Sequence, residues 1–339
     1  MPISLHYIIK RSFSALAILI GVLIVTYILI YIAPGNPAYV WAGRPRGPKA
    51  IEAIENAVKE LGLNKPIHEQ IAIHVIKFFS GDWGTSIRFK QLVKDLVLRN
   101  LASTIELLIF SFLIAIPIGI FMGMYAALYR GSKIDTLIQL TSSILANSPR
   151  FWIAIAFILA LQNIGLSTFG RISPEYRIEI HEITGFYIID SILQNRFDIL
   201  LDVVLRLIPP ALAVATYPIG LLSRMTRMLL SESLQEEYVR EAISLGLPRK
   251  VVVFRYALRG VIPALTQISG LVFAYSIVDA MAVEYVFGRE GLGYIIIKAI
   301  PANDYPLIIS SLSIIAMIYI IVNTIVDIVQ ASINPRVRV

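Results

Sequence analysis

The chemically reactive residue types of this 339-residue chain do not form a catalytic or metal-binding motif. Zinc-protease helices carry two histidines four residues apart, whereas His68-Glu69 and His181-Glu182 each lack a second histidine at that spacing. Gly131-Ser132-Lys133 has the wrong residue order for a phosphate-binding loop, so the chain is not expected to bind ATP itself. With four histidines and no cysteine, we predict no metal site, no catalytic residues and no cofactor in this chain.

Two charged residues lie within long apolar segments, where an ionisable side chain is costly and usually functional. Arg150 follows Pro149 in one segment, and Asp279 lies mid-way along another. Because a hydrated solute needs polar walls to cross a membrane, we predict that Arg150 and Asp279 face a translocation path. The alternative is that each pairs with a group on a partner subunit or extends to a nearby membrane interface. Glu106 and Glu284 lie near the ends of such segments, so we expect them at an interface.

The long apolar segments that position these charges predict an integral membrane protein. Hydrophobic residues make up 57% of the chain and charged residues 16%, against about half and a quarter in soluble domains. A helix that spans a bilayer needs about 20 apolar residues. Segments of that length occupy residues 8–33, 102–129, 136–162, 206–224, 261–285 and 307–330. The sequence therefore predicts an all-α fold with six transmembrane helices, and prolines interrupt the fourth.

The basic residues of the short connecting segments predict the orientation in the membrane. Segments 1–11, 129–135 and 334–339 together hold six Lys or Arg residues and one Asp, whereas the loop 163–206 has six acidic and four basic residues. Short basic segments stay in the cytoplasm, and long segments cross the membrane largely regardless of charge. We therefore predict a multi-pass protein of the cell membrane with both termini in the cytoplasm and the long segment 34–100 outside.

The outer segment 34–100 has the pattern of a small helical subdomain. Pro48 suits the start of a helix, apolar residues then recur at helical spacing, and Gly62 suits its end. Pro66 predicts the start of a second helix that ends near Gly81. The alternative is a solvated linker, but linkers lack such periodicity.

The longest predicted cytoplasmic segment, residues 224–262, has the pattern of two helices joined at a corner. Ser233 and Glu236 match a capping box, which predicts that the first helix begins there. Gly246 can take the left-handed conformation that ends a helix, and Pro248 suits the first turn of the next.

The second of these helices is expected to have an apolar side formed by Val251, Phe254 and Leu258, next to basic residues. A short helix pair with apolar and charged surface is suited to docking a partner. The alternative is an amphipathic loop that lies on the bilayer.

Motifs along the chain resemble those of the permease subunits of importer-type ABC transporters. The stretch Tyr238-Val239-Arg240-Glu241-Ala242, with Gly246 and Ile262-Pro263, resembles the EAA loop of that family. Its Tyr-Val-Arg opening is similar to the dipeptide/oligopeptide/nickel branch. The other matching motifs, in chain order, are Ala33-Pro34-Gly35-Asn36-Pro37, Gly81-Asp82-Trp83-Gly84, Ser148-Pro149-Arg150-Phe151-Trp152, Glu284-Tyr285-Val286-Phe287-Gly288, Gly291-Leu292-Gly293, Asp304-Tyr305-Pro306 and Asn334-Pro335-Arg336.

The resemblance implies the first, B-type permease of such an importer, with the type I importer permease fold. Residues 1–33 would form an N-terminal transmembrane helix, 34–100 the extracellular helical subdomain, and 101–329 the transmembrane permease domain. The implied partners are a second homologous permease, two cytoplasmic ATPases that bind ATP and Mg²⁺, an extracellular substrate-binding protein and membrane lipid, but no nucleic acid. The ATPase-coupling residues that the resemblance implies are Tyr238, Arg240, Glu241, Ala242, Gly246, Leu247 and Pro248.

Two features depart from the family pattern, and the cargo stays open. Ile243 and Leu245 are apolar where the family often has a basic residue, and Arg240 replaces an acidic residue. The resemblance does not choose among a peptide, an oligosaccharide and nickel. An ion-coupled secondary transporter is the alternative function. It would be expected to have inverted repeats, no clear half-to-half similarity is present, and it would leave the corner unexplained. A membrane enzyme ranks third because no catalytic constellation occurs.

Overall fold

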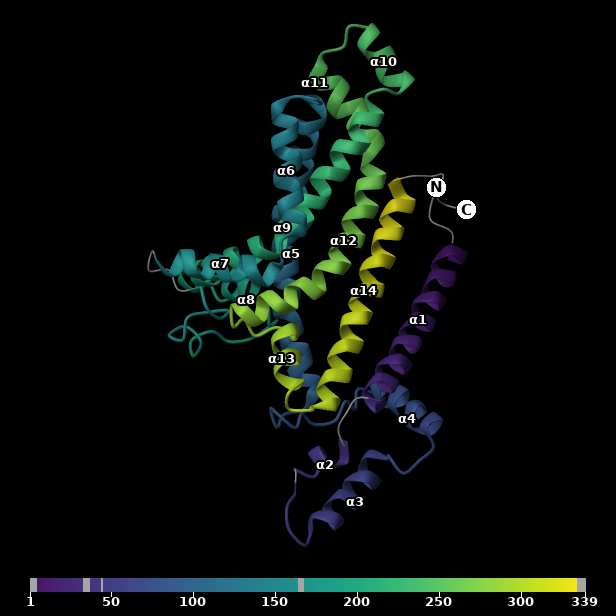
Figure 1. Ribbon diagram of the computed structural model, residues 1–339, viewed down its shortest axis with the longest axis vertical. Coiled ribbons are helices and arrows are strands. Elements are labelled where there is room, and N and C mark those ends of the chain that lie inside the picture. The colour runs from purple at the N-terminus through teal and green to yellow at the C-terminus, as the bar shows by residue number, and fades with distance from the viewer. Residues whose placement is uncertain (1–4, 33–36, 44, 164–167, 334–339) are drawn as a thin grey trace. The chain divides into compact units, whose positions relative to one another are not determined.

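The computed structural model describes residues 5–32, 37–43, 45–163 and 168–333 (Figure 1). Within these ranges the secondary structure is helical and no strand is present, although Thr85 and Leu92 form an isolated bridge. The predicted all-α fold is therefore confirmed. The described residues fall into two compact units. Unit 1 contains Ser103–Arg289 and the residues from Val322 onward, and unit 2 contains Leu5–Ala102 and Glu290–Ile321.

Four helical segments are long and apolar enough to cross a membrane. They are Val93–Leu128 (α5), Phe197–Ser233 (α9), the continuous stretch Arg249–Val286, and Tyr305–Gln330 within α14 (Tyr305–Ile333). A bent helix pair provides a fifth candidate. The first predicted span corresponds to α1 (Leu5–Ile32), whose apolar stretch Phe13–Ile28 is shorter than these. The integral membrane character is confirmed, and the count of six spans stays a prediction.

The third predicted span, residues 136–162, is not one straight helix. It is divided into α6 (Lys133–Asn147) and α7 (Arg150–Gln162), which meet at 101°. Ser148 has φ −69° and ψ 134°, and Pro149 is similarly extended. A residue before proline disfavours the helical region, and the proline has no N–H to continue the helical hydrogen bonding. The Ser148-Pro149 step therefore ends one helix before the next begins.

The core of unit 1 forms around α9, which contacts α6, α7, α12 (Leu258–Val286) and the short α8 (Tyr187–Leu193) (Figure 1). Three prolines lie inside α9, namely Pro209, Pro210 and Pro218, and all three are buried. Neighbouring helices can compensate for the hydrogen bonds that such prolines remove. The fourth predicted span is thus continuous, and it is longer than residues 206–224.

A close helix approach in unit 1 explains one of the glycines of α5. A Cβ atom at Gly123 would collide with the carbonyl oxygen of Ser223 and with Thr226, both on α9. Small residues allow helix backbones in a membrane to approach closely. Gly123 therefore fixes the packing of α5 against α9.

Unit 2 contains the outer subdomain and the elements that pack on it. These elements are α1, α2 (Pro37–Trp41), α3 (Ala50–Leu61), α4 (Ile67–Ser80), the start of α5, α13 (Leu292–Ala299) and the first part of α14. Leu23, Val93, Val97, Leu292 and Leu307 are fully buried in its core.

The two helices predicted for the outer segment are confirmed by α3 and α4. Gly62 ends α3 with φ +69°, and Gly81 ends α4 with φ +78°. Both glycines take the left-handed conformation that commonly ends a helix. Asp304 then ties the loop after α4 to the start of α14, because it accepts hydrogen bonds from the Ser86 hydroxyl at 2.5 Å and the Arg88 amide at 3.0 Å.

Candidate functional site

The corner in unit 1 is built by α10 (Glu237–Ser244), Gly246, Pro248 and α11 (Arg249–Val251). Gly246 has φ +75°, which confirms the left-handed conformation predicted there. Its amide donates to the Ile243 carbonyl at 2.9 Å, and the Leu247 amide donates to the Ala242 carbonyl at 3.3 Å. This pair of bonds is the Schellman arrangement, which satisfies the last carbonyls of a helix. Pro248 then precedes α11, as predicted.

The predicted start of the first helix at Ser233 is wrong. Ser233 is the last residue of α9, and Glu236 is the N-cap of α10 without a side-chain hydrogen bond. The Ser233 hydroxyl instead donates to the Ala257 carbonyl at 3.0 Å and lies 3.0 Å from the Tyr238 hydroxyl. Since this serine has a long-range partner, it holds the two ends of the loop together rather than starting a helix.

The predicted apolar side of the second helix is also wrong. Residues 252–257 form a π-helix that joins α11 to α12, and its buried residues are Val252, Val253 and Ala257. Phe254 is 51% exposed. A π-helix has more residues per turn than an α-helix, so the inward positions differ from those that α-helical spacing predicts.

The inner side of the corner is apolar and packs on the ends of α5 and α9. Val239 and Ala242 of α10 are buried against Met124, Ala127 and Leu230. Because this contact involves three helices, α10 has a fixed position within unit 1. Ala242 lies in this core, and Leu247 is half-buried at its edge.

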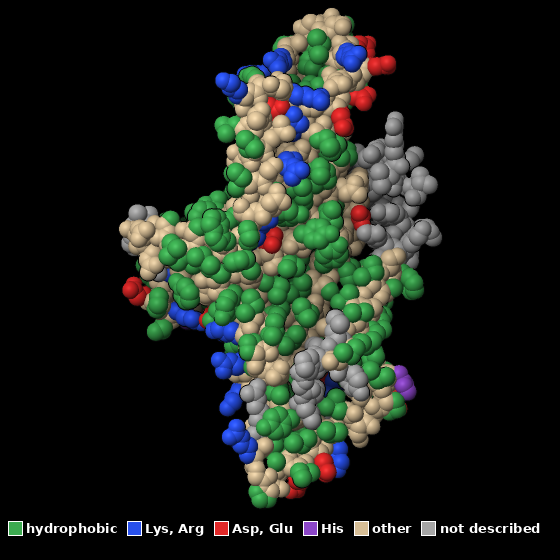
Figure 2. All heavy atoms as spheres, viewed as in Figure 1, with side chains coloured by type: hydrophobic (Ala, Val, Ile, Leu, Met, Phe, Trp, Pro, Cys, Tyr) green, Lys and Arg blue, Asp and Glu red, His purple; other side chains and the backbone are tan. Residues whose placement is uncertain are grey.

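The outer side of the corner carries most of the predicted coupling residues. Tyr238, Arg240, Glu241, Gly246 and Pro248 are exposed there. Figure 2 shows charged side chains gathered at this end of the unit and hydrophobic side chains along α12. The structure therefore divides the predicted set into an exposed group, a buried alanine and a half-buried leucine.

Two exposed apolar residues add to this surface. Ile243 is 56% exposed and Leu245 is 74% exposed. The sequence analysis noted them only as departures from the family pattern. Exposed large apolar side chains beside charged ones are typical of interaction surfaces. We call the exposed residues Tyr238, Arg240, Glu241, Ile243, Leu245, Gly246 and Pro248 the corner surface.

The two charged residues predicted to face a translocation path are in contact with each other. Arg150 Nε lies 3.5 Å from Asp279 Oδ2, and the side chains are 9% and 32% exposed. The guanidinium also lies 5.0 Å from the centre of the Tyr217 ring. The pair joins α7 to α12 at the level of the bend in the third span. Whether this pair faces a translocation path stays a prediction.

Arg150 also completes the hydrogen bonding of the broken span. Its Nη2 donates to the Ala146 carbonyl at 2.8 Å, and its Nη1 donates to the carbonyls of Leu145 and Ser148. These are carbonyls at the end of α6, which have no partner within the helix. A cation at a helix C-terminus also interacts favourably with the helix dipole.

A second charged cluster in unit 1 was not predicted as a cluster. Glu106 Oε2 accepts from Arg289 at 2.5 Å and from Arg171 at 3.2 Å, and Glu106 Oε1 accepts from the Ile188 amide at 3.1 Å. Glu106 and Glu284 are 4% and 0% exposed. The Thr104 hydroxyl donates to Glu284 at 2.6 Å. These acids lie inside the protein, and the contacts of Glu106 fix the loops after α7 and α12.

Two of the motifs that carried the resemblance lie largely or wholly outside the described residues. These are positions 33–36 and positions 334–336.

Comparison with known proteins matches almost the whole chain. The family of binding-protein-dependent transport system inner membrane components matches residues 115–339, and the N-terminal family of the same transport-system membrane components matches residues 4–107. The dipeptide transport system permease protein of Alkalihalophilus pseudofirmus is 34% identical over 98% of this chain and 99% of its own length.

Two further relatives have the same coverage. The di/tripeptide transport system permease protein of Pseudomonas aeruginosa is 34% identical over 98% of this chain and 99% of its own length. The probable D,D-dipeptide transport system permease protein of Escherichia coli K12 is 30% identical over 97% and 96%.

Proposed function

Because the chain belongs to the family of binding-protein-dependent transport system inner membrane components and is a permease subunit of an ABC importer, we propose that its cargo is a short peptide. The relatives reported above carry dipeptide or tripeptide transport in their names. This supports a peptide over an oligosaccharide or nickel as cargo. The fold is that of a type I importer permease, and the family implies an ATPase and a substrate-binding protein as partners.

The corner surface is the observation that carries the proposed mechanism. It presents Ile243 and Leu245 beside Arg240 and Glu241 on a helix that is fixed by its buried side. In the proposed mechanism this surface docks in a cleft of a cytoplasmic ATPase. Closure of two ATPases on ATP and Mg²⁺ would move α10, and the packing of α10 on α5 and α9 would transmit that movement to the spans.

The proposed assembly contains this chain, a second homologous permease, two ATPases and a substrate-binding protein on the outer side. Both termini and the corner surface would lie in the cytoplasm. The chain supplies no phosphate-binding loop, so ATP hydrolysis would belong entirely to the ATPase subunits.

The test is reconstitution of the complete transporter in proteoliposomes with a dipeptide as cargo. Leu245→Asp places a charge on the corner surface without changing the backbone conformation, and it should abolish association with the ATPase and peptide-stimulated ATP hydrolysis. Ile51→Asp is the matched control, because Ile51 is 71% exposed in the outer subdomain. Normal peptide uptake by Leu245→Asp would contradict the docking role, and absence of peptide uptake by the wild-type complex would contradict the proposed cargo.

A further inference from the structure

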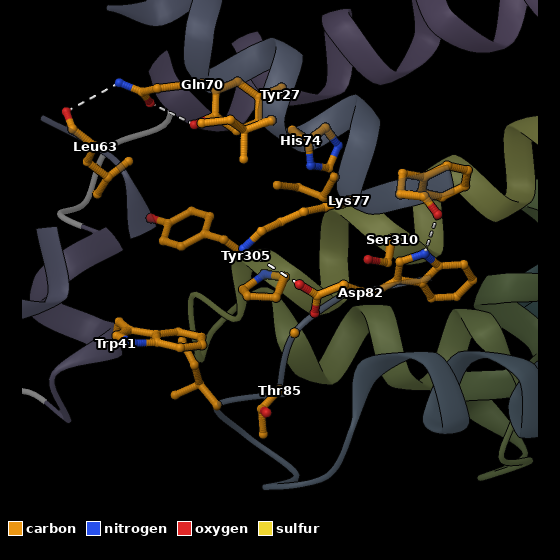
Figure 3. Close-up of a pocket in the computed structure, with 17 residues that line it drawn as sticks. Tyr27, Trp41, Leu63, Gln70, His74, Lys77, Asp82, Thr85, Tyr305 and Ser310 are labelled. Atoms are coloured by element: carbon orange, nitrogen blue, oxygen red, sulfur yellow. Dashed lines mark hydrogen bonds and ion pairs between the residues drawn. The ribbon is translucent and has the colours of Figure 1, made fainter. Parts of the chain in front are cut away.

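Unit 2 contains a cavity of about 420 Å³ between α1, α2, α4, the loop after α4 and the start of α14 (Figure 3). Cavities of roughly 300–1,000 Å³ hold most small-molecule ligands. The aromatic residues that line it are Tyr27, Trp41, Phe78, Trp83 and Tyr305. A cavity of this size with aromatic walls is suited to a ligand with an apolar side chain.

The hydrogen bonds of two wall residues are already used within the protein. Gln70 accepts from the Tyr27 hydroxyl at 2.7 Å and donates to the carbonyls of Leu63 and Lys65 at 3.2 and 2.7 Å. Trp83 donates to the Phe78 carbonyl at 2.9 Å, and the two rings are stacked. Because these contacts are internal, the walls are pre-formed rather than dependent on a ligand.

Two buried polar atoms that line the cavity have no hydrogen-bond partner among the described residues. They are Nε2 of His74 and the hydroxyl oxygen of Tyr305. Tyr305 is only 8% exposed. A buried polar atom without a partner is unfavourable, and a peptide group offers both a donor N–H and an acceptor C=O. Desolvation lowers the pKa of His74 to about 4, so its ring is neutral at physiological pH and can hydrogen-bond to such a group.

The edge of the cavity carries one charge of each sign. Lys77 Nζ lies 3.8 Å from Asp82 Oδ2, and the side chains are 54% and 64% exposed. An exposed ion pair contributes little to stability, about 0–1 kcal/mol. Lys77 and Asp82 can therefore exchange each other for a carboxylate and an ammonium group of a ligand at small cost.

We propose that this cavity is a binding site for a short zwitterionic peptide with an apolar or aromatic side chain. Tyr305 and His74 bind its peptide group, Lys77 its carboxylate, Asp82 its ammonium group, and the aromatic walls its side chain. The inference rests on the proposed function, since it makes the cargo itself a ligand of the outer subdomain. The permease would then select its cargo in addition to the substrate-binding protein.

The test uses the full chain in nanodiscs, with Ala-Phe as the probe and tryptophan fluorescence as the readout. Two of the three tryptophans, Trp41 and Trp83, line the cavity, so a Trp152→Phe background confines the signal to them. Ala-Phe should produce a saturable change. In that background, Tyr305→Phe and Lys77→Gln should each weaken binding about tenfold, because each removes one polar contact.

Two controls separate this site from a non-specific apolar cavity. Tyr39→Phe removes a hydroxyl from a residue of α2 that does not line the cavity, and it should leave binding unchanged. The capped peptide N-acetyl-Ala-Phe-amide has the same side chain without terminal charges, and it should bind at least tenfold more weakly. Equal binding of the capped peptide, wild-type affinity of Tyr305→Phe, or no saturable binding of Ala-Phe would overturn the proposal.

The failure of this inference can be told apart from the failure of the proposed function. If the complete transporter takes up Ala-Phe while the chain alone does not bind it, the cavity proposal is wrong and the importer function stands. If the complete transporter takes up no peptide, the proposed cargo is wrong.

Discussion

Arg150 and Asp279 form an ion pair in which Nε and Oδ2 are 3.5 Å apart, and the same guanidinium satisfies carbonyls at the end of α6. One side chain thus joins three helices, namely α6, α7 and α12. The two residues have unequal roles in this arrangement. Arg150 has several partners and is almost fully buried, whereas Asp279 has the pair alone among the printed contacts and is more exposed.

Removal of Arg150 is expected to be more destabilising than removal of the Asp279 charge. Arg150→Met leaves a partly buried carboxylate without its cation and also leaves the α6 carbonyls unsatisfied, a loss of about 3–5 kcal/mol in comparable buried pairs. Asp279→Asn leaves those carbonyl contacts intact, so its cost should be smaller. Thermal unfolding of the purified variants in detergent measures both. The matched control is Arg196→Met, which breaks an exposed pair with Asp198 and should cost under about 1 kcal/mol. Equal melting temperatures for Arg150→Met and Arg196→Met would contradict the structural role of Arg150.

Gly246 provides a test of the corner that separates backbone strain from steric contact. A Cβ atom at this position would meet nothing within 4 Å, so a substitution acts through φ +75° alone. Gly246→Val should cost about 1–3 kcal/mol of local strain and misplace Leu247 and Glu241. We expect a correctly inserted permease with impaired ATPase docking and little peptide-stimulated hydrolysis.

The control for this variant is Gly246→Asn, because asparagine tolerates the left-handed conformation better than other residues with a side chain. It should retain most of the activity in the same hydrolysis assay. If valine and asparagine have equal effects, or if Gly246→Val transports normally, the backbone conformation of the corner is not important for coupling.

Local signals in the sequence were sufficient for several elements. Gly62 and Gly81 end the outer helices where expected, and Gly246 and Pro248 define the corner. In each case the conformational preference of a glycine or proline decides the structure over a few residues. No distant contact is needed for such a prediction to succeed.

The predictions that failed depended on distant contacts or on a change of helical period. Ser233 has the right residue type for a cap, but its hydroxyl bonds to Ala257 across the loop. The π-helix moves the buried side of residues 252–257 to Val252, Val253 and Ala257, which no α-helical pattern anticipates. Prolines are accommodated inside α9, whereas Pro149 separates two helices.

The candidate sites show the same division. The polarity and spacing of the corner were readable from neighbouring residues, and so was the rarity of charge at Arg150 and Asp279. Their ion pair was not, because it joins segments that only the packing of α7 and α12 brings together. The cavity in unit 2 is likewise lined by residues from α1, α2, α4 and α14.

His74 gives the outer subdomain an expected pH dependence. Burial lowers its pKa to about 4 from 6.5, so the folded state keeps the ring neutral while the unfolded chain takes up a proton at higher pH. Stability from this residue is fully present above pH 6.5 and is lost as the pH falls toward 4. The neighbouring ring of Tyr27 stays neutral in this range, and Lys77 stays charged.

Tryptophan fluorescence of the full chain in the Trp152→Phe background, followed from pH 7.5 to pH 4, measures this loss. Protonation of His74 should loosen the cavity walls and change the emission of Trp41 and Trp83. In His74→Gln the side chain does not titrate, so the change between pH 6.5 and 4 should be much smaller. An identical pH profile for wild type and His74→Gln would show that another group is responsible.

The orientation predicted from the basic segments is open to a direct labelling test, because the chain has no cysteine and any single cysteine is therefore a unique label site. Glu55 lies on the exposed side of α3 in the outer subdomain, and Lys250 is exposed beside the corner surface. In intact cells, Glu55→Cys should react with a membrane-impermeant maleimide, since segment 34–100 is predicted to lie outside. Lys250→Cys should react only after the membrane is permeabilised, because short basic segments stay in the cytoplasm. Both positions are accessible in the folded chain, so a difference between them reports the membrane barrier rather than burial. The reverse labelling pattern would invert the topology and place the corner surface out of reach of any cytoplasmic ATPase.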